Sequence, residues 1–321
     1  MKFASITLCL VASLTSSCAI TYLQLNSAQL QTATEAYAAQ NYELCSDLLS
    51  DLDIDDFIIG AKHEYALMRG MSAHHLGQAE RSINELTEYL TLPGAVPAQM
   101  RVVEKILLDY ANKYIDGEIK TLWIFTTPGN GYLILEDLAI LASDVELQAE
   151  SIARIAEHYF SDRRYKRAAP YYSMLLDPRF NSLGWGDRAT YRFVECRYLM
   201  LIPEKSDEQT IMFALKSARS YIADFPAGAN RVDALAIADD CVTKIVQLHR
   251  DIAEYYVAIG NQPGAEHHFK LASGQESQGD SSETGLILGS QQPQGDSSKT
   301  VLIPSSQQFA SFGRPWGEYA K

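Results

Sequence analysis

Positive charge is scarce in this sequence. Its 321 residues include 27 lysines and arginines against 40 aspartates and glutamates, which gives a formal net charge of −13. Proteins that bind nucleic acids neutralise phosphates with lysine and arginine, so this balance argues against a nucleic-acid partner. The apolar fraction of 47% is ordinary for a globular protein, and a chain of this length can bury a large core.

Cysteine is also rare, and its positions exclude two kinds of site. Cys9 and Cys18 lie in an N-terminal leader, which leaves Cys45, Cys196 and Cys241. No CxxC pair occurs, so a zinc site is not expected. Three cysteines cannot form a fully paired disulfide framework, and we expect them to be small buried apolar side chains.

Motifs for catalysis and for ligand binding are missing as well. There is no GxSxG, HExxH or Cys–His signature, and we therefore expect a protein that is not an enzyme. The adjacent histidines at 74–75 and 267–268 cannot form a chelating i, i+4 pair on a helix. The acidic run 51–56 lacks the glycine and glutamate of a calcium loop, and residues 129–131 lack a phosphate-binding fingerprint. No metal and no cofactor are expected.

The leader reads MKFASITLCLVASLTSSC, with a positive Lys2 followed by an apolar run too short to span a bilayer. It resembles a bacterial lipoprotein signal peptide over residues 1–17, although Thr15 stands where an aliphatic residue is usual. This resemblance implies a diacylglyceryl group on Cys18, which would begin a lipidated linker over 18–31. Ala19, rather than aspartate, favours the outer membrane by the same resemblance. The other interpretation is an ordinary cleaved secretory signal.

The segment HRDIAEYYVAIGNQPGAEHHFKLA, residues 249–272, has the pattern of two helices joined by a tight turn. Ile252, Tyr255, Tyr256 and Ile259 fall on one face of the first helix. Residues 260–263 are typical of a turn, and the second helix places small and aromatic residues as a tetratricopeptide repeat does. The same pattern occurs earlier, around 155–172. One hairpin cannot bury its apolar face alone, so we predict an all-α fold, an α-solenoid of tetratricopeptide-like helical hairpins.

The predicted repeats fall into an N-terminal set over 32–117 and a C-terminal set over 133–272. Residues 118–132 separate them as an inter-module loop, which includes the apolar stretch LWIFTTPGNGYL. Two interpretations of this stretch remain open, a buried plug between the modules and an exposed wedge that binds a partner.

A basic turn, SDRRYKR at 161–167, stands out in this acidic chain. It is either a solvated loop between helices or an anchor for an acidic partner surface, because arginine pairs well with carboxylates. The possible partner-binding residues are Arg163, Arg164, Tyr165 and Arg167.

The C-terminal tail, residues 273–321, differs from the rest in composition. It contains two related blocks, QGDSSETGLILGSQQ and QGDSSKTVLIPSSQQ. A segment so rich in serine, glutamine and glycine cannot bury a core, so we predict disorder. Its short apolar triplets serve either as docking patches or as parts of a plain linker.

The stretch YIADFP at 221–226, the helix that follows it and IAEYY at 252–256 resemble the BamD/YfiO family of envelope lipoproteins. The resemblance is clearest from residue 149 to 272. It implies a lipid on Cys18 and a non-catalytic scaffold on the periplasmic face of the outer membrane, in the assembly of β-barrel proteins. The implied partners are a β-barrel assembly protein or other envelope proteins. The alternative is a periplasmic tetratricopeptide adaptor in cell-wall or division complexes.

Overall fold

The structure is a computed structural model that describes residues 28–57, 59–121, 125–202 and 206–274. It confirms the predicted fold class, an all-α solenoid of tetratricopeptide-like helical hairpins. The predicted signal peptide, Cys18 and the tail from 275 onward lie outside the described residues. Contacts divide the chain into two units, one that ends at Leu248 and one that begins at His249.

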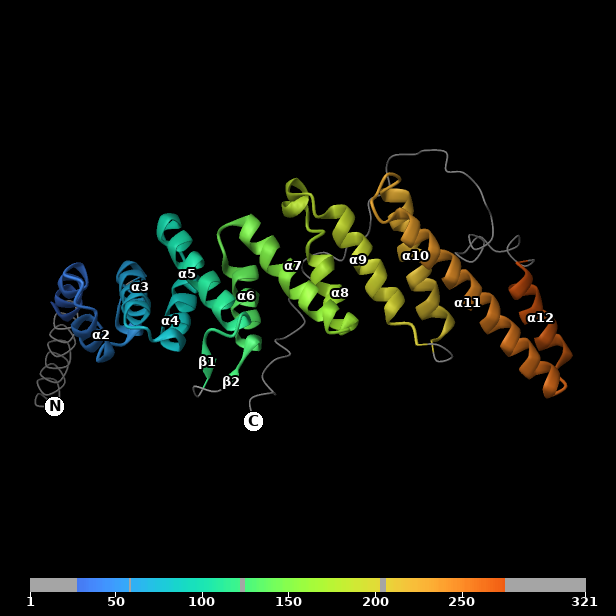
Figure 1. Cartoon of the computed structure of the whole chain (residues 1–321), viewed down its shortest axis with the longest axis horizontal. Helices are drawn as coiled ribbons and strands as arrows, with labels where there is room; N and C mark the ends of the chain where they lie inside the picture. The colour runs from blue at the N-terminus through green and yellow to red at the C-terminus, as the bar shows by residue number, and fades with distance from the viewer. Residues whose placement is uncertain (1–27, 58, 122–124, 203–205, 275–321) are drawn as a thin grey trace, which may run out of the picture. The chain divides into compact units, whose positions relative to one another are not determined.

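In the first unit, each helix packs against its neighbours in the chain (Figure 1). Helical residues 28–38 precede α2 (Tyr42–Ser50), and a short 3-10 turn, η1 (Ile54–Asp56), leads to the next hairpin. The later hairpins are α3 (Ile59–His75) with α4 (Ala79–Thr91), α5 (Pro97–Ile115) with α6 (Pro128–Leu141), α7 (Val145–Ser161) with α8 (Tyr165–Met174), and α9 (Gly186–Leu199) with α10 (Glu208–Asp224). The turn η2 (Pro178–Leu183) precedes α9, and α11 (Arg231–Ala258), which begins in the first unit and ends in the second, follows α10.

The same left-handed turn ends the first helix of five hairpins. The turn residue has a positive φ in each case: 60° at Gln40, 72° at Gly77, 74° at Gly117, 58° at Arg163 and 75° at Gly260. The next amide N–H then donates to a carbonyl oxygen five residues back, at 2.8 to 2.9 Å, from Asn41 to Ala36, Gln78 to Ala73, Glu118 to Lys113, Arg164 to Tyr159 and Asn261 to Tyr256. This geometry is the Schellman motif, in which glycine is the favoured residue because it has no Cβ.

Two of these turns therefore carry a side chain where glycine would be easier. We expect Gln40→Gly to raise the free energy of unfolding by about 1 kcal/mol, because a Cβ in the left-handed region costs energy. The reverse change, Gly77→Gln, is the matched control and should lower stability by a similar amount, since the space around Gly77 is open. Urea unfolding followed by circular dichroism measures both. Shifts in the same direction for both variants would contradict this explanation.

The buried apolar side chains of the first unit form three clusters. One lies between residues 30 and 68, the largest between 66 and 196, and the third between 194 and 245. Tyr65 and Ala66 on α3 belong to different clusters, as do Val194 and Cys196 on α9. These two helices therefore face one cluster on each side, as the middle helices of a repeat stack should.

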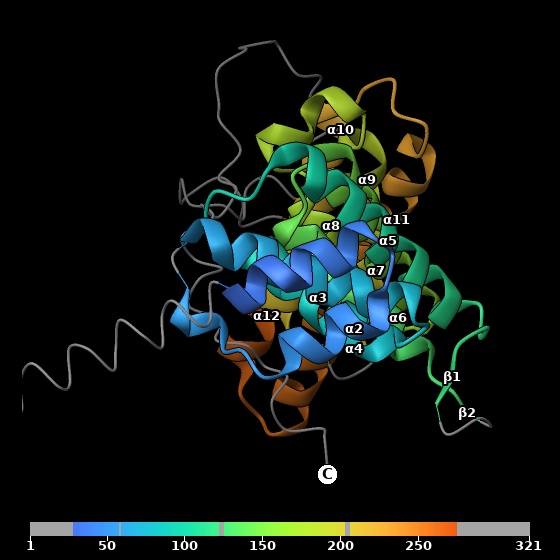
Figure 2. The ribbon, with the colours of Figure 1, turned by 90° about the vertical axis from the view of Figure 1, so that its left-hand side faces the viewer.

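The predicted inter-module loop is wrong in its second half. Residues 128–132 belong to α6, which begins at Pro128, because proline is well suited to the first turn of a helix. A two-stranded antiparallel ribbon, β1 (Lys120–Thr121) with β2 (Phe125–Thr126), connects α5 to α6 and projects from the helices in Figure 2. Residues 122–124 of the proposed plug or wedge lie outside the described residues.

The division into two sets of repeats at this loop is not seen either. Gly131 of α6 lies against α5 so closely that an added Cβ would come within 2.5 Å of the carbonyl oxygen of Ala111. The two helices flanking the loop thus form one hairpin inside the largest cluster. At the N-terminal end, residues 28–31 are helical, so the predicted linker over 18–31 is too long by these residues.

The expectation for the three remaining cysteines is confirmed. Cys45, Cys196 and Cys241 are free and fully buried. Burial raises the pKa of the Cys196 thiol to about 12 and that of the Cys241 thiol to about 11. These thiols therefore stay protonated and unreactive near neutral pH.

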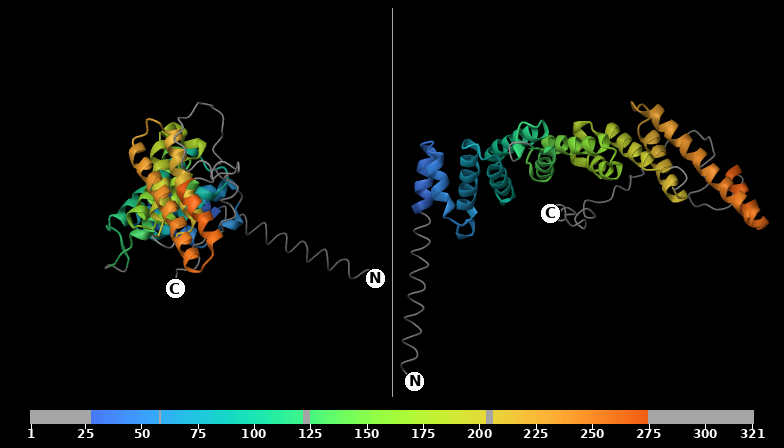
Figure 3. Two further views of the ribbon diagram at one scale, coloured as in Figure 1. Left: turned by 90° about the vertical axis from the view of Figure 1, so that its right-hand side faces the viewer. Right: turned by 60° about the horizontal axis from the view of Figure 1, so that its bottom comes forward.

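In the second unit, α12 (Gln262–Ser273) folds back along the end of α11 (Figure 3). The small residues of this hairpin, Ala253 and Ala265, are buried at 0% and 1% exposure. The predicted apolar face is only partly correct, because Tyr255 and Ile259 are 63% and 56% exposed. Phe269 of α12 is also exposed, and no later hairpin among the described residues covers these side chains.

The histidines of this unit have a contact that the sequence did not indicate. His249 is buried on α11, and its Nδ1 lies 3.2 Å from the Nδ1 of His268 on α12. Tyr256 stacks on the His268 ring, with the ring centroids 5.6 Å apart. The pair contributes a polar contact to the crossing of α11 and α12.

Candidate functional site

The candidate site is an open groove over one face of α7. This helix is capped at its N-terminus by Asp144, whose carboxylate accepts a hydrogen bond from the Glu146 amide, and the left-handed turn at Arg163 follows its C-terminal end. The side chains on the inner face of α7 are buried in the largest cluster, among them Ile152, Ile155 and Ala156. The outer face carries polar side chains at helical spacing, and those that line the groove are Glu150, Arg154, Glu157, His158 and Ser161.

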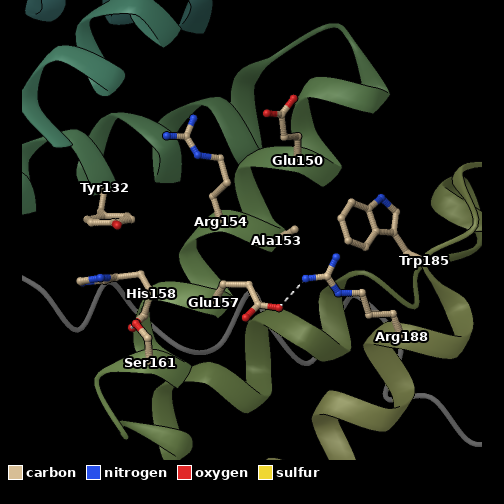
Figure 4. Close-up of a pocket in the computed structure, with 9 residues that line it drawn as sticks. All are labelled: Tyr132, Glu150, Ala153, Arg154, Glu157, His158, Ser161, Trp185 and Arg188. Carbon is tan, nitrogen blue, oxygen red and sulfur yellow. Dashed lines mark hydrogen bonds and ion pairs between the residues drawn. The ribbon is translucent and has the colours of Figure 1, made fainter. Parts of the chain in front are cut away.

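Two aromatic residues from neighbouring elements flank this face. Tyr132 of α6 stacks on His158, with the ring centroids 3.8 Å apart and the planes inclined by 14°. Trp185 directly precedes α9, where Gly184 turns the chain with a φ of 75°. Figure 4 shows Tyr132 and His158 at one side of the groove and Trp185 at the other. The groove has a volume of about 520 Å³, which is within the usual range for ligand sites.

The acidic side chain in the centre of the groove is already paired. The Glu157 carboxylate lies 2.9 Å from Arg188 Nη2 and 3.8 Å from Arg192 Nε. Arg192 also pairs with Glu195 at 2.8 Å. Glu157 is thus held by two guanidinium groups, and its negative charge is compensated.

Arg154 is in a different situation. Among the described residues its guanidinium has no ion pair and no hydrogen bond (Figure 4). Burial raises the pKa of the Tyr132 hydroxyl, and the nearby positive charge of Arg154 opposes that rise. The groove therefore holds one arginine whose hydrogen-bond donors are available to a ligand.

A serine, a histidine and an aspartate lie together at one end of the groove, which raises the question of nucleophilic catalysis. The Ser161 hydroxyl donates to the backbone carbonyl oxygen of His158 at 2.8 Å, and no hydrogen bond joins it to the imidazole ring in the described structure. His158 Nε2 lies 3.9 Å from Asp162, which is beyond hydrogen-bonding distance. This arrangement does not match a nucleophile activated by a base.

The four predicted partner-binding residues lie in the turn after α7 and in the first turn of α8. Arg163 and Arg164 are exposed, and they adjoin Ser161 at the end of the groove. Tyr165 is half-buried and packs edge-to-face on Phe160, with the centroids 5.4 Å apart. Arg167 lies over the ring of Tyr159, 5.7 Å from its centroid. None of the four lines the groove.

The sequence analysis missed the groove residues Tyr132, Arg154, Trp185 and Arg188. A signal for part of the site was present, because the polar residues of α7 recur every three or four positions. Tyr132 and Trp185 come from other elements, and no periodicity connects them to α7.

A second depression, of about 530 Å³, lies at the start of α4 and is lined by polar residues that include Arg81 and Glu85. Both side chains have structural partners. Arg81 donates to the hydroxyl of Ser46 at 3.0 Å, and Glu85 pairs with Arg69 at 2.5 Å. This depression is therefore a less suitable candidate than the groove on α7.

Three findings concern the chain beyond these two depressions. Over the described ranges, no group of three or more histidine, cysteine, aspartate or glutamate side chains could hold a metal ion. In the same part of the chain, no helix is long and apolar enough to cross a membrane. The sequence matches no known protein family, and no curated protein is significantly similar to it.

Proposed function

We propose that this chain is a non-catalytic scaffold lipoprotein on the periplasmic face of the outer membrane, and that its groove on α7 holds a segment of a partner protein. The observation that carries the scaffold role is the open groove, which offers an unpaired arginine between aromatic surfaces. Stacked helical hairpins commonly present extended or helical segments of partners in such grooves. The resemblance to the BamD/YfiO family supports β-barrel assembly as the process.

The experiment for the scaffold role is photo-crosslinking in envelope membranes. A photoreactive amino acid replaces Glu150 in the groove, and a matched variant carries it at Ser220, an exposed position on α10 outside the groove. Mass spectrometry then identifies the captured proteins. A β-barrel assembly protein captured only from position 150 supports the proposal. Capture of cell-wall or division proteins alone favours the adaptor, and equal capture from both positions removes the groove from the proposal.

The lipid anchor rests on the leader sequence and has its own test. Cys18→Ala should shift the protein from the membrane pellet to the soluble fraction, because acyl chains on Cys18 supply the membrane affinity. Cys9→Ala, which changes a cysteine within the leader, is the matched control and should leave the protein in the pellet. Retention of the Cys18→Ala protein in the membrane would argue against the anchor.

A further inference from the structure

The charges around the groove indicate the kind of segment that it binds. The chain as a whole is acidic, but residues 145–192 contain eight lysines and arginines against six aspartates and glutamates. This region includes α7, the basic turn and the start of α9. A local positive excess in a negative chain attracts acidic ligands and disfavours basic ones.

Arg154 supplies a specific point of attachment within this region. It lies one helical turn after Glu150 and one turn before His158, and it lines the groove with both. Its guanidinium is partly exposed, so a ligand can reach it. A carboxylate that paired with Arg154 would form a charge-assisted, bidentate hydrogen bond without displacing a partner within the described structure.

Two carboxylates, Glu150 and Glu157, line the groove with two arginines, Arg154 and Arg188, so the positive excess comes from the residues that flank the groove. Glu150 lies one helical turn from Arg154 and has no ion pair within the described structure. Glu157 is compensated by Arg188 and Arg192, and the Arg188 side chain is 59% exposed. The Arg188 guanidinium also lies 5.8 Å from the centroid of the Trp185 ring. The centre of the groove thus offers the exposed guanidinium of a paired arginine beside a large planar surface.

The aromatic flanks determine what else the ligand should carry. The stacked rings of Tyr132 and His158 and the indole of Trp185 form planar walls on either side of Arg154 (Figure 4). Planar and apolar side chains gain free energy when they pack on such rings. A segment with alternating acidic and aromatic residues would pair a carboxylate with Arg154 and pack its aromatic side chains on these rings.

We infer that the groove on α7 binds an acidic segment of its partner protein, with a carboxylate paired to Arg154 and an adjacent aromatic side chain packed on Trp185 or Tyr132. This inference rests on the proposed function, since it specifies the ligand of the same groove. The volume of about 520 Å³ suits a few side chains of an extended segment rather than a whole domain.

The probe is a fluorescein-labelled six-residue peptide of alternating glutamate and tyrosine, and its control has glutamine in place of glutamate. Fluorescence anisotropy measures the binding of each peptide to the purified full chain. We expect the glutamate peptide to bind and the glutamine peptide to bind at least about tenfold more weakly, because the charge-assisted pair is lost. Binding should weaken in about 1 M NaCl, which screens exposed charges.

Matched variants locate the interaction. Arg154→Gln should reduce affinity for the glutamate peptide about tenfold, and Trp185→Leu should reduce the affinity for both peptides. Arg101→Gln removes an exposed arginine from α5, outside the groove, and should leave binding unchanged. Thermal unfolding of each variant checks that it is folded. Equal binding of the two peptides, no binding of either, or equal behaviour of the Arg154 and Arg101 variants would overturn the inference.

The outcomes separate this inference from the proposed function. If crosslinking from position 150 captures an envelope protein but the glutamate peptide fails to bind, the groove has a partner of different chemistry. If the peptide binds through Arg154 but no envelope protein is captured, the ligand chemistry stands and the scaffold role fails.

Discussion

Replacing Gly131 by alanine is expected to lower the free energy of unfolding by about 3 kcal/mol. The added Cβ would lie 2.5 Å from the carbonyl oxygen of Ala111 and 2.7 Å from Cγ1 of Ile115. A backbone oxygen within α5 cannot move away as a side chain can, so the two helices must separate. Their separation would loosen the contacts that bury Leu135 and Leu138 in the largest cluster.

The control for this change lies two residues earlier on the same helix. A Cβ added at Gly129, in the open first turn of α6, would have no neighbouring atom within 4 Å. Gly129→Ala should therefore cost nothing and can gain up to about 1 kcal/mol from helix propensity. Urea unfolding followed by circular dichroism compares the two variants. A similar small effect for both would show that α5 and α6 can separate at little cost.

Removing the hydroxyl of Tyr221 is expected to have the second large effect. The ring is fully buried, and its hydroxyl donates to Asp187 Oδ1 at 2.5 Å. The Tyr221 hydroxyl oxygen also accepts a hydrogen bond from the amide of Asn230 at 3.3 Å. Asp187 Oδ2 accepts one from the amide of Ala229 at 3.1 Å. These contacts fasten the loop after α10 to the start of α9.

Tyr221→Phe should therefore lower the free energy of unfolding by about 2 kcal/mol, since it leaves Asp187 and the Asn230 amide each without one partner. Tyr221→Ala should cost about 4 kcal/mol, because it also leaves a cavity. Tyr255→Phe, at a tyrosine that is 63% exposed, is the control and should change stability by less than about 0.5 kcal/mol. If Tyr221→Phe proved as stable as the wild type, the hydroxyl network would make no net contribution.

The hairpins could be predicted from the sequence because each depends on local signals. Apolar residues at helical spacing located the helices, and Gly260 marked a turn that the structure places in the left-handed region. Pro128 gave a misleading signal, since proline can interrupt a helix or begin one, and only packing against α5 decides between the two.

Other features depend on contacts that one helix cannot reveal. The apolar face at Tyr255 and Ile259 predicted burial, but a pattern on one helix does not say whether another helix covers it. The groove has the same limitation, because Tyr132 and Trp185 approach α7 only after the hairpins stack. The basic turn was visible in the sequence, but the packing of Tyr165 on Phe160 and of Arg167 over Tyr159 was not.

The separate clusters of the first unit have a consequence for how its backbone opens. Amide hydrogen exchange in a repeat stack reflects neighbour-to-neighbour coupling, so its ends can fray while its middle stays closed. The slowest-exchanging amides should lie in α5, α6 and α7, which contribute to the largest cluster. Residues 28–50 belong to the small first cluster and should exchange earlier. Because the groove is formed on α7, the ligand surface would remain intact during excursions in which the N-terminal hairpin opens.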